Sequence, residues 1–288
     1  MSTRRFRGLA VSGSVAITFV IGLMGMLPAV AQDDQAKMPW APVRTIDGQP
    51  DIQGYWSNSD IPSSVFISLE PSGEREGVVY GGALPKGSIV VEPQDGLIPF
   101  QPWAAAKKQW LSETYTDPQD RTHIDPNARC LPAGVPRINY VTPYNEYRIL
   151  QKPGHVVIMA EWNHIARVIP VDGRPHVDSN VRLWMGDSRG RWEGNTLIVE
   201  TTNFNDKTWF DIVGTFHSDA LRVIERYTIV DADTMTYEAT IEDPNVYSRP
   251  WTVGFGFTRI LPNNPEAGEI YEYACHEGNR ATEFILRQ

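Results

Sequence analysis

The feature that most restricts the fold of this chain is a succession of strand-like segments in its second half. From residue 147 onward, short runs rich in Val, Ile, Thr and aromatic residues recur between turn residues such as Gly194-Asn195. Segments at this spacing, joined mainly by hairpin turns, predict an antiparallel meander closed into a barrel or a curled sheet. The expected strands are residues 147–151, 155–161, 164–171, 181–185, 191–193, 196–202, 220–230, 235–242, 249–260 and 269–276.

The first half of the sequence is less regular. A first strand is expected at residues 51–56, and a long insert rich in loops follows at about 57–145. The insert holds one predicted helix, residues 102–115, which begins at Pro102. We therefore expect a mostly β chain with one helix, folded as a single domain over residues 32–288. The predicted apolar side of the helix consists of Trp103, Ala106, Trp110 and Leu111.

Residues 1–31 have the features of a secretory signal peptide. Arg4, Arg5 and Arg7 form a positive region, an apolar stretch follows, and Ala29-Val30-Ala31 is a small-x-small cleavage site. The apolar stretch is shorter than a membrane span needs, although a leader retained as an anchor is the alternative. We expect a periplasmic or secreted protein with no attachment to the membrane once the leader is removed.

The chain is acidic and contains two cysteines. It has 26 Lys and Arg against 35 Asp and Glu, a net charge of −9, which becomes −12 without the three arginines of the leader. An acidic surface disfavours nucleic acid as a partner. In an oxidising compartment, Cys130 and Cys275 are expected to form a disulfide, with a reactive thiol or a metal ligand as the alternatives. The six histidines show no metal-ligand spacing, so neither a metal nor another cofactor is predicted.

Strand alternation places one carboxylate on a buried face. In the segment 221–229, the odd positions are Leu221, Val223, Glu225, Tyr227 and Ile229, so Glu225 lies in the middle of an apolar face. A buried carboxylate must be neutral, paired or hydrogen-bonded. One interpretation is a structural pair with an arginine, and the other is a catalytic acid or base in a ligand cavity that Tyr227 also lines.

A later strand offers arginine partners for this acid. One face of the segment 249–259 carries Arg249, Trp251 and Arg259, with Val and Phe residues between them. Either arginine is expected to pair with Glu225 or to hold an anionic group of a ligand. Trp162, Trp184 and Trp192 are further candidates for lining the mouth of the barrel, because aromatic walls suit flat apolar ligands.

Three histidines are weaker candidates. If Trp162-Asn163 is a two-residue turn, Glu161 and His164 lie opposite each other, which is the minimum needed for acid–base catalysis. The alternative is a surface pair at a hairpin tip. His217 in a loop and His276 beside Cys275 are a further catalytic and a further ligand-binding candidate, although a loop histidine is more often a polar surface residue.

Short motifs give two resemblances. Gly54-x-Trp56 ahead of an antiparallel meander resembles the lipocalin-like (calycin) barrels. This resemblance implies that Trp56 plugs the closed end of the barrel and that Arg259 or Arg287 packs across it. The chain also resembles a functionally uncharacterised family of exported bacterial proteins, which implies no chemistry. That resemblance rests on the strings at residues 129–132, 186–194, 201–204 and 273–279.

Three functions are consistent with these patterns. The first is an exported, cofactor-independent enzyme that acts on a small apolar or aromatic molecule by acid–base chemistry, as an isomerase, lyase or hydrolase. The second is a non-catalytic binding protein for a small hydrophobic ligand. The third is an envelope interaction module that uses the insert at 57–145. The carboxylate of Glu225 on an apolar face favours the enzyme, and the sequence does not predict the substrate or the oligomeric state.

Overall fold

A computed structural model describes residues 40–58, 61, 65, 67–71, 88–140, 146–261, 269–280 and 283. The expected signal peptide at residues 1–31 and the candidate Arg287 lie outside the described residues. Residues Trp40–Gln288 form one compact unit. None of the helices in the described part is long and apolar enough to cross a membrane.

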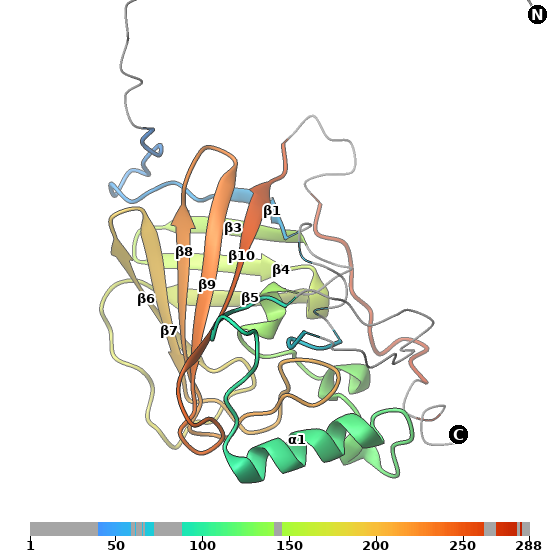
Figure 1. Cartoon of the computed structure of the whole chain (residues 1–288). Helices are drawn as coiled ribbons and strands as arrows, with labels where there is room; N and C mark the ends of the chain where they lie inside the picture. Colours follow the sequence, from blue (N-terminus) through green and yellow to red (C-terminus); the bar gives the residue numbers. More distant parts are fainter. Residues whose placement is uncertain are drawn as a thin grey trace, which may run out of the picture. The chain divides into compact units, whose positions relative to one another are not determined.

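The described strands form one antiparallel sheet. Its members are β1 (Gly54–Ser57), β2 (Val90–Glu92), β3 (Glu146–Lys152), β4 (His155–Ala160), β5 (Ile165–Pro170), β6 (Asp187–Glu193), β7 (Thr196–Thr202), β8 (Arg222–Ile229), β9 (Thr234–Glu242) and β10 (Trp251–Arg259). Nine of them follow the order β5-β4-β3-β1-β10-β9-β8-β7-β6, and β2 pairs separately with β10. In Figure 1, β3–β5 cross the direction of β6–β10, so the sheet curls back on itself. The predicted antiparallel β fold is confirmed.

The barrel is nearly closed at the edges β5 and β6. These two strands lie next to each other, but no ladder joins them in the described part of the chain. Gly190 of β6 allows the close approach, because a Cβ atom there would lie 2.7 Å from Val171 Cγ1 and 3.0 Å from Ile169 Cγ2. Side chains rather than backbone hydrogen bonds therefore close this seam, by which we mean the boundary between β5 and β6.

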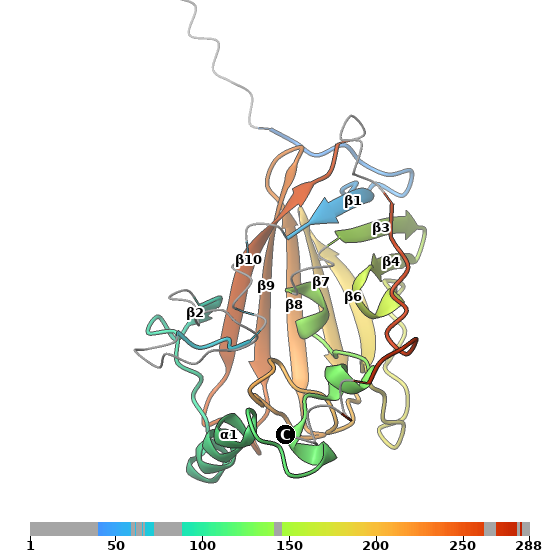
Figure 2. The same ribbon diagram turned by 90° about the vertical axis from the view of Figure 1, so that its right-hand side faces the viewer.

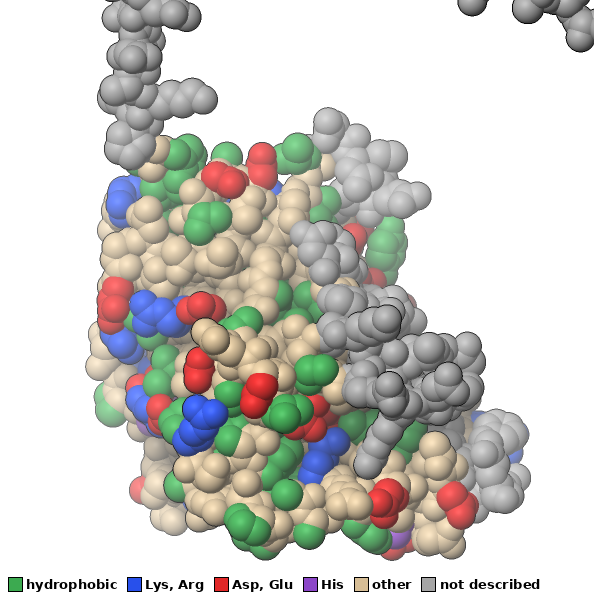
Figure 3. All heavy atoms as spheres, viewed as in Figure 1, with side chains coloured by type: hydrophobic (Ala, Val, Ile, Leu, Met, Phe, Trp, Pro, Cys, Tyr) green, Lys and Arg blue, Asp and Glu red, His purple; other side chains and the backbone are tan. Residues whose placement is uncertain are grey.

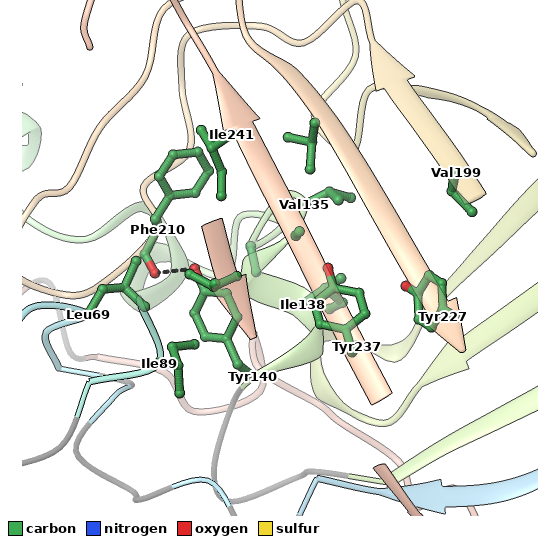
Figure 4. Close-up of a cluster of buried hydrophobic side chains, with 14 of the residues drawn as sticks. Leu69, Ile89, Val135, Ile138, Tyr140, Val199, Phe210, Tyr227, Tyr237 and Ile241 are labelled. Atoms are coloured by element: carbon green, nitrogen blue, oxygen red, sulfur yellow. Dashed lines mark hydrogen bonds between the residues drawn. The ribbon is translucent and has the colours of Figure 1, made fainter. Parts of the chain in front are cut away.

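Alternation along the strands directs one face inward, as the sequence predicted. Every odd position from Leu221 to Ile229 is buried, and so is every odd position of β9. The inside is filled by side chains of the insert as well as of the sheet. Figure 4 shows Val135, Ile138 and Tyr140 among the residues of β8 and β9, with the Tyr140 hydroxyl donating to the Phe210 carbonyl oxygen at 2.8 Å. The insert thus supplies part of the core.

The helix α1 (Pro102–Thr114) begins at Pro102 as predicted, but it buries a different side. Its buried residues are Ala104, Lys108 and Leu111, whereas Trp103 and Trp110 are 54% and 44% exposed. Lys108 is accommodated because its ammonium group donates to the Val213 carbonyl oxygen at 3.0 Å. Of the predicted apolar side, only Leu111 is buried. The other three positions were predicted wrongly, because the long aliphatic part of a lysine packs like an apolar side chain once its charged end finds an acceptor.

Two predicted strands are absent from the described residues. In the segment 181–185, Leu183 makes a single parallel bridge to Phe204 and no ladder. Residues 269–280, which we call the tail, contain no strand. The disulfide Cys130–Cys275 fixes the tail to the insert, so the predicted disulfide is confirmed. A disulfide is compatible with an exported protein.

The contact expected at the end of the barrel near β1 is present. The Arg259 guanidinium lies over the Trp56 ring at 4.2 Å from its centroid, and Trp56 is fully buried. Gly54 leaves room for this arrangement, because a Cβ atom there would lie 2.8 Å from Arg259 Nη1. The glycine of the Gly-x-Trp motif is therefore explained by the arginine that packs across the tryptophan.

On the face drawn in Figure 3, positive and negative side chains are mixed and do not form a large patch of a single charge. Basic and acidic side chains stand next to one another there. Ion pairs on the outer face of the sheet follow the same rule: Arg222 of β8 bridges Glu200 and Glu242 on the two neighbouring strands. Such exposed pairs contribute little to stability, about 0–1 kcal/mol each.

Candidate functional site

The carboxylate of Glu225 is enclosed in a hydrogen-bond network inside the barrel. Its exposed fraction is zero. Arg167 of β5 binds it with two hydrogen bonds, from Nη1 to Oε1 at 3.0 Å and from Nη2 to Oε2 at 2.6 Å. The hydroxyls of Tyr227 and Tyr237 and the amide of Asn139 also donate to Oε1, at 2.8, 3.0 and 3.0 Å. This is a paired carboxylate whose partners come from the sheet and from the insert (Figure 2 shows the turns of the insert in front of β7 and β8).

The electrostatics of this network keep Arg167, Tyr227 and Tyr237 protonated. Burial lowers the pKa of Arg167, but the charge and hydrogen bonds of Glu225, together with the two tyrosines, more than offset this effect, so the pKa lies above that of an ordinary arginine. Burial, and next the charge of Glu225, raise the pKa values of Tyr227 and Tyr237 well above that of a free tyrosine. Both hydroxyls therefore stay protonated and donate.

The arginine partner differs from the two expected ones. Arg249 lies at the surface, 3.5 Å from Glu92, and Arg259 lies over Trp56. Arg167 was missed, although alternation could have found it: it stands between Ile165 and Ile169 on the inward face of β5. Its Nη2 also donates to Ser188 Oγ of β6 at 3.2 Å, so this residue spans the seam.

Glu161 and His164 do not form the expected cross-strand pair. The β4–β5 ladder ends at Ala160–Ile165, so both residues belong to the connecting loop. Glu161 is buried, and burial raises the pKa of its carboxyl group. His164 is exposed, with a positive φ of 52°. Trp162 and Asn163 do lie between two residues joined by a backbone hydrogen bond, because the His164 N–H donates to the Glu161 carbonyl oxygen at 3.0 Å. The chain there forms the 3-10 turn η5 (Trp162–His164), and burial differs between Glu161 and His164, so the two side chains are not a cross-strand pair.

His217 lies in the core rather than at the surface. Its Nδ1 donates to the Ser218 carbonyl oxygen at 2.8 Å, so its Nε2 accepts from the Thr208 hydroxyl at 2.6 Å. The ring stacks on Phe210 with centroids 5.3 Å apart. Burial lowers the pKa of His217, and the neutral imidazole is therefore the stable form.

The four tryptophans predicted to line a cavity differ in burial. Trp162 and Trp251 are buried, whereas Trp184 and Trp192 are half-buried. None of the four lines any of the three cavities that are described below.

Two adjoining cavities surround the disulfide. The first, which we call the tail pocket, has a volume of about 310 Å³. The second, the arginine pocket, has a volume of about 270 Å³ and shares Cys130 and His276 with the first. The tail pocket is lined by Cys130, Pro132, Asn163, Ile165, Tyr273, Ala274, Cys275, His276 and Glu277, and the arginine pocket by Arg121, Arg129, Cys130, His276 and Asn279.

Local turns of the insert build these two cavities. Asp120 and Asp125 accept from backbone N–H groups and so begin the 3-10 turns η2 (Arg121–His123) and η3 (Pro126–Arg129). Cys130 then adopts a left-handed conformation, with φ of 60°. Asn163 fixes the β4–β5 loop against this segment by accepting from the Ala133 N–H at 3.1 Å. Of the predicted site residues, only His276 and the two cysteines line these cavities.

A third cavity of about 300 Å³ lies next to Trp56, between Trp40, Val43 and Arg259. The described residues contain no group of three or more His, Cys, Asp or Glu side chains arranged to hold a metal ion.

No protein-family model, curated protein or solved structure matches the chain.

Proposed function

We propose that this chain is an exported, non-catalytic binding protein that takes a small, largely apolar molecule in the tail pocket. The observation that carries the proposal is the cavity itself: about 310 Å³, open, and lined by Pro132, Ile165, Ala274 and the disulfide as well as by polar groups. Cavities of this size, mainly apolar and with a few polar groups, are typical of small-molecule sites. The signal peptide predicted from the sequence and the disulfide support a periplasmic or secreted location.

The state of Glu225 favours binding over acid–base catalysis. A catalytic acid or base must reach a substrate and change its protonation during the reaction. Glu225 has no exposed surface, and a bidentate arginine and three further donors hold its carboxylate. The network therefore supports a structural role for this acid.

The experiment uses octan-1-ol as an apolar, uncharged probe. We expect it to shift the NMR signals of the Ile165 and Ala274 methyl groups in a saturable manner. Ala274→Trp should abolish this binding, because the indole fills the tail pocket. The matched control is Ala232→Trp, which fills the cavity beside Trp40 and should leave the Ile165 shift unchanged.

Two results would reject the proposal. One is that octan-1-ol leaves both methyl signals unchanged in the wild-type chain. The other is that Ala274→Trp binds the probe as well as the wild type does. If Ala232→Trp alone abolished binding, the ligand site would lie beside Trp40 and Arg259 instead.

A further inference from the structure

The arginine pocket is a cationic hollow on an acidic protein. Arg121 opens the turn η2 and Arg129 closes the turn η3, so one short segment brings two guanidinium groups to the same cavity. His276 and Asn279 reach the cavity from the tail, which the disulfide holds in place. The hollow thus combines two fixed positive charges with two further polar side chains.

Neither arginine has a carboxylate partner among the described residues. The nearby acid, Asp125, is occupied by Arg137, which binds it with two hydrogen bonds of 2.7 Å. The Nε atom of Arg129 is buried and has no hydrogen-bond partner. Arg121 is exposed and forms no salt bridge within the described part of the chain.

This arrangement leaves positive charge incompletely compensated. Burial lowers the pKa of Arg129; Asp125 raises it, and Arg121 lowers it again. A partly desolvated charge without a partner is unfavourable, so an anion from solution that binds both guanidinium groups would be stabilised. A planar carboxylate matches the fork of an arginine better than other small anions of a single charge centre do.

We propose that the ligand is an apolar molecule that carries a carboxylate or a similar oxyanion. Its head binds Arg121 and Arg129, and its apolar body lies in the tail pocket. This inference rests on the proposed function, because the two pockets share Cys130 and His276. Glu277 lines the tail pocket and repels an anionic head there, so it directs the head to the arginine side.

The experiment compares octanoate with octan-1-ol, two probes of equal chain length that differ in charge. At neutral pH and low salt, we expect the wild-type chain to bind octanoate about tenfold more tightly, with a shift of the Arg129 Nε–H signal in the NMR spectrum. Arg129→Gln and Arg121→Gln should each lower the affinity for octanoate by about tenfold and leave the affinity for octan-1-ol unchanged. Added salt should lower the affinity for octanoate and leave that for octan-1-ol unchanged.

The control for the loss of a positive charge is Arg226→Gln, which replaces an exposed arginine on the outer face of β8. This variant should bind octanoate in preference to octan-1-ol as strongly as the wild type does. The inference is overturned if octanoate binds no more tightly than octan-1-ol, or if Arg226→Gln weakens octanoate as much as Arg129→Gln does. If octanoate shifts the Arg129 signal while octan-1-ol leaves Ile165 unchanged, the arginine pocket binds anions and the apolar site fails. The two proposals can therefore fail separately.

Discussion

At position 225, a carboxylate with no exposed surface and a guanidinium from another strand stabilise each other. A buried ion pair is weak evidence for net stability, because desolvation of two charges offsets much of their attraction. Removal of one partner is different, because it leaves the other charge buried and alone. Replacement of Glu225 alone is therefore expected to lower the free energy of unfolding more than replacement of both partners does.

We expect Glu225→Gln to lower the free energy of unfolding by about 3–5 kcal/mol, because Arg167 then stays buried without its counter-charge. Urea unfolding measures this loss. The control Glu238→Gln removes an exposed acid from β9 and should change stability by less than about 0.5 kcal/mol. The double variant Glu225→Gln/Arg167→Met should recover part of the loss. A single variant as stable as the control would contradict the structural role.

A second prediction concerns pH and His217. Burial lowers the pKa of its imidazole below 6.5, so the unfolded chain binds this proton more readily than the folded one. Stability is therefore unaffected well above pH 6.5 and falls as the pH drops below that value, by up to about 2 kcal/mol at pH 5. Unfolding free energies at pH 7.5 and 5 measure the effect.

His217→Gln isolates this contribution from that of carboxyl groups with raised pKa values, such as Glu70 and Glu161, which act in the opposite direction at lower pH. The variant should lose less stability than the wild type between pH 7.5 and 5. Equal losses in both proteins would show that the histidine is not held neutral.

At the scale of elements, strands with local partners could be predicted and those that depend on distant neighbours could not. β8 and β9 are joined by a short turn, and both were predicted as strands; β8 alternates clearly, so its inward face could be predicted from the sequence. The segment 181–185 was also expected to be a strand, but in the structure it makes a single parallel bridge, from Leu183 to Phe204, and no ladder. Arg167 pairs with a residue 58 positions away across the seam, and alternation can show its burial but not its partner.

The tail is the element on which the candidate site depends most. We expect Cys130→Ser/Cys275→Ser to lower the free energy of unfolding by at most about 4–5 kcal/mol, since a long loop is no longer closed in the unfolded chain. The same variant should lose octan-1-ol binding, because Tyr273, Ala274 and His276 line the tail pocket only while the tail is fixed. Titration followed at the Ile165 methyl measures this.

Reduction of the wild-type disulfide should reproduce the effect of the double serine variant, and the reductant should not change the variant further. If the double serine variant bound octan-1-ol with unchanged affinity, the tail would not form the site.

At the scale of the molecule, the barrel is a curled sheet whose two edge strands, β5 and β6, are joined by side-chain contacts. Strands β7 to β10 are paired on both sides, whereas β5 and β6 each have one unpaired edge at the seam. Arg167 crosses that seam to Ser188 and Glu225. The hydrogen-bond network around the buried carboxylate of Glu225 therefore also holds β5 and β6 together.

This arrangement predicts how the barrel opens. In native-state hydrogen exchange, amides of β5 and β6 should exchange through openings of lower free energy than those of β8 and β9, because edge strands have fewer contacts to break. Glu225→Gln should widen this difference by loosening Arg167, and it should accelerate β5 and β6 more than β10. Glu238→Gln should leave the order of exchange unchanged. If β5, β6 and β9 exchanged with equal free energies in the wild type, the seam would be as strong as a backbone ladder, and its closure by side chains would have to be rejected.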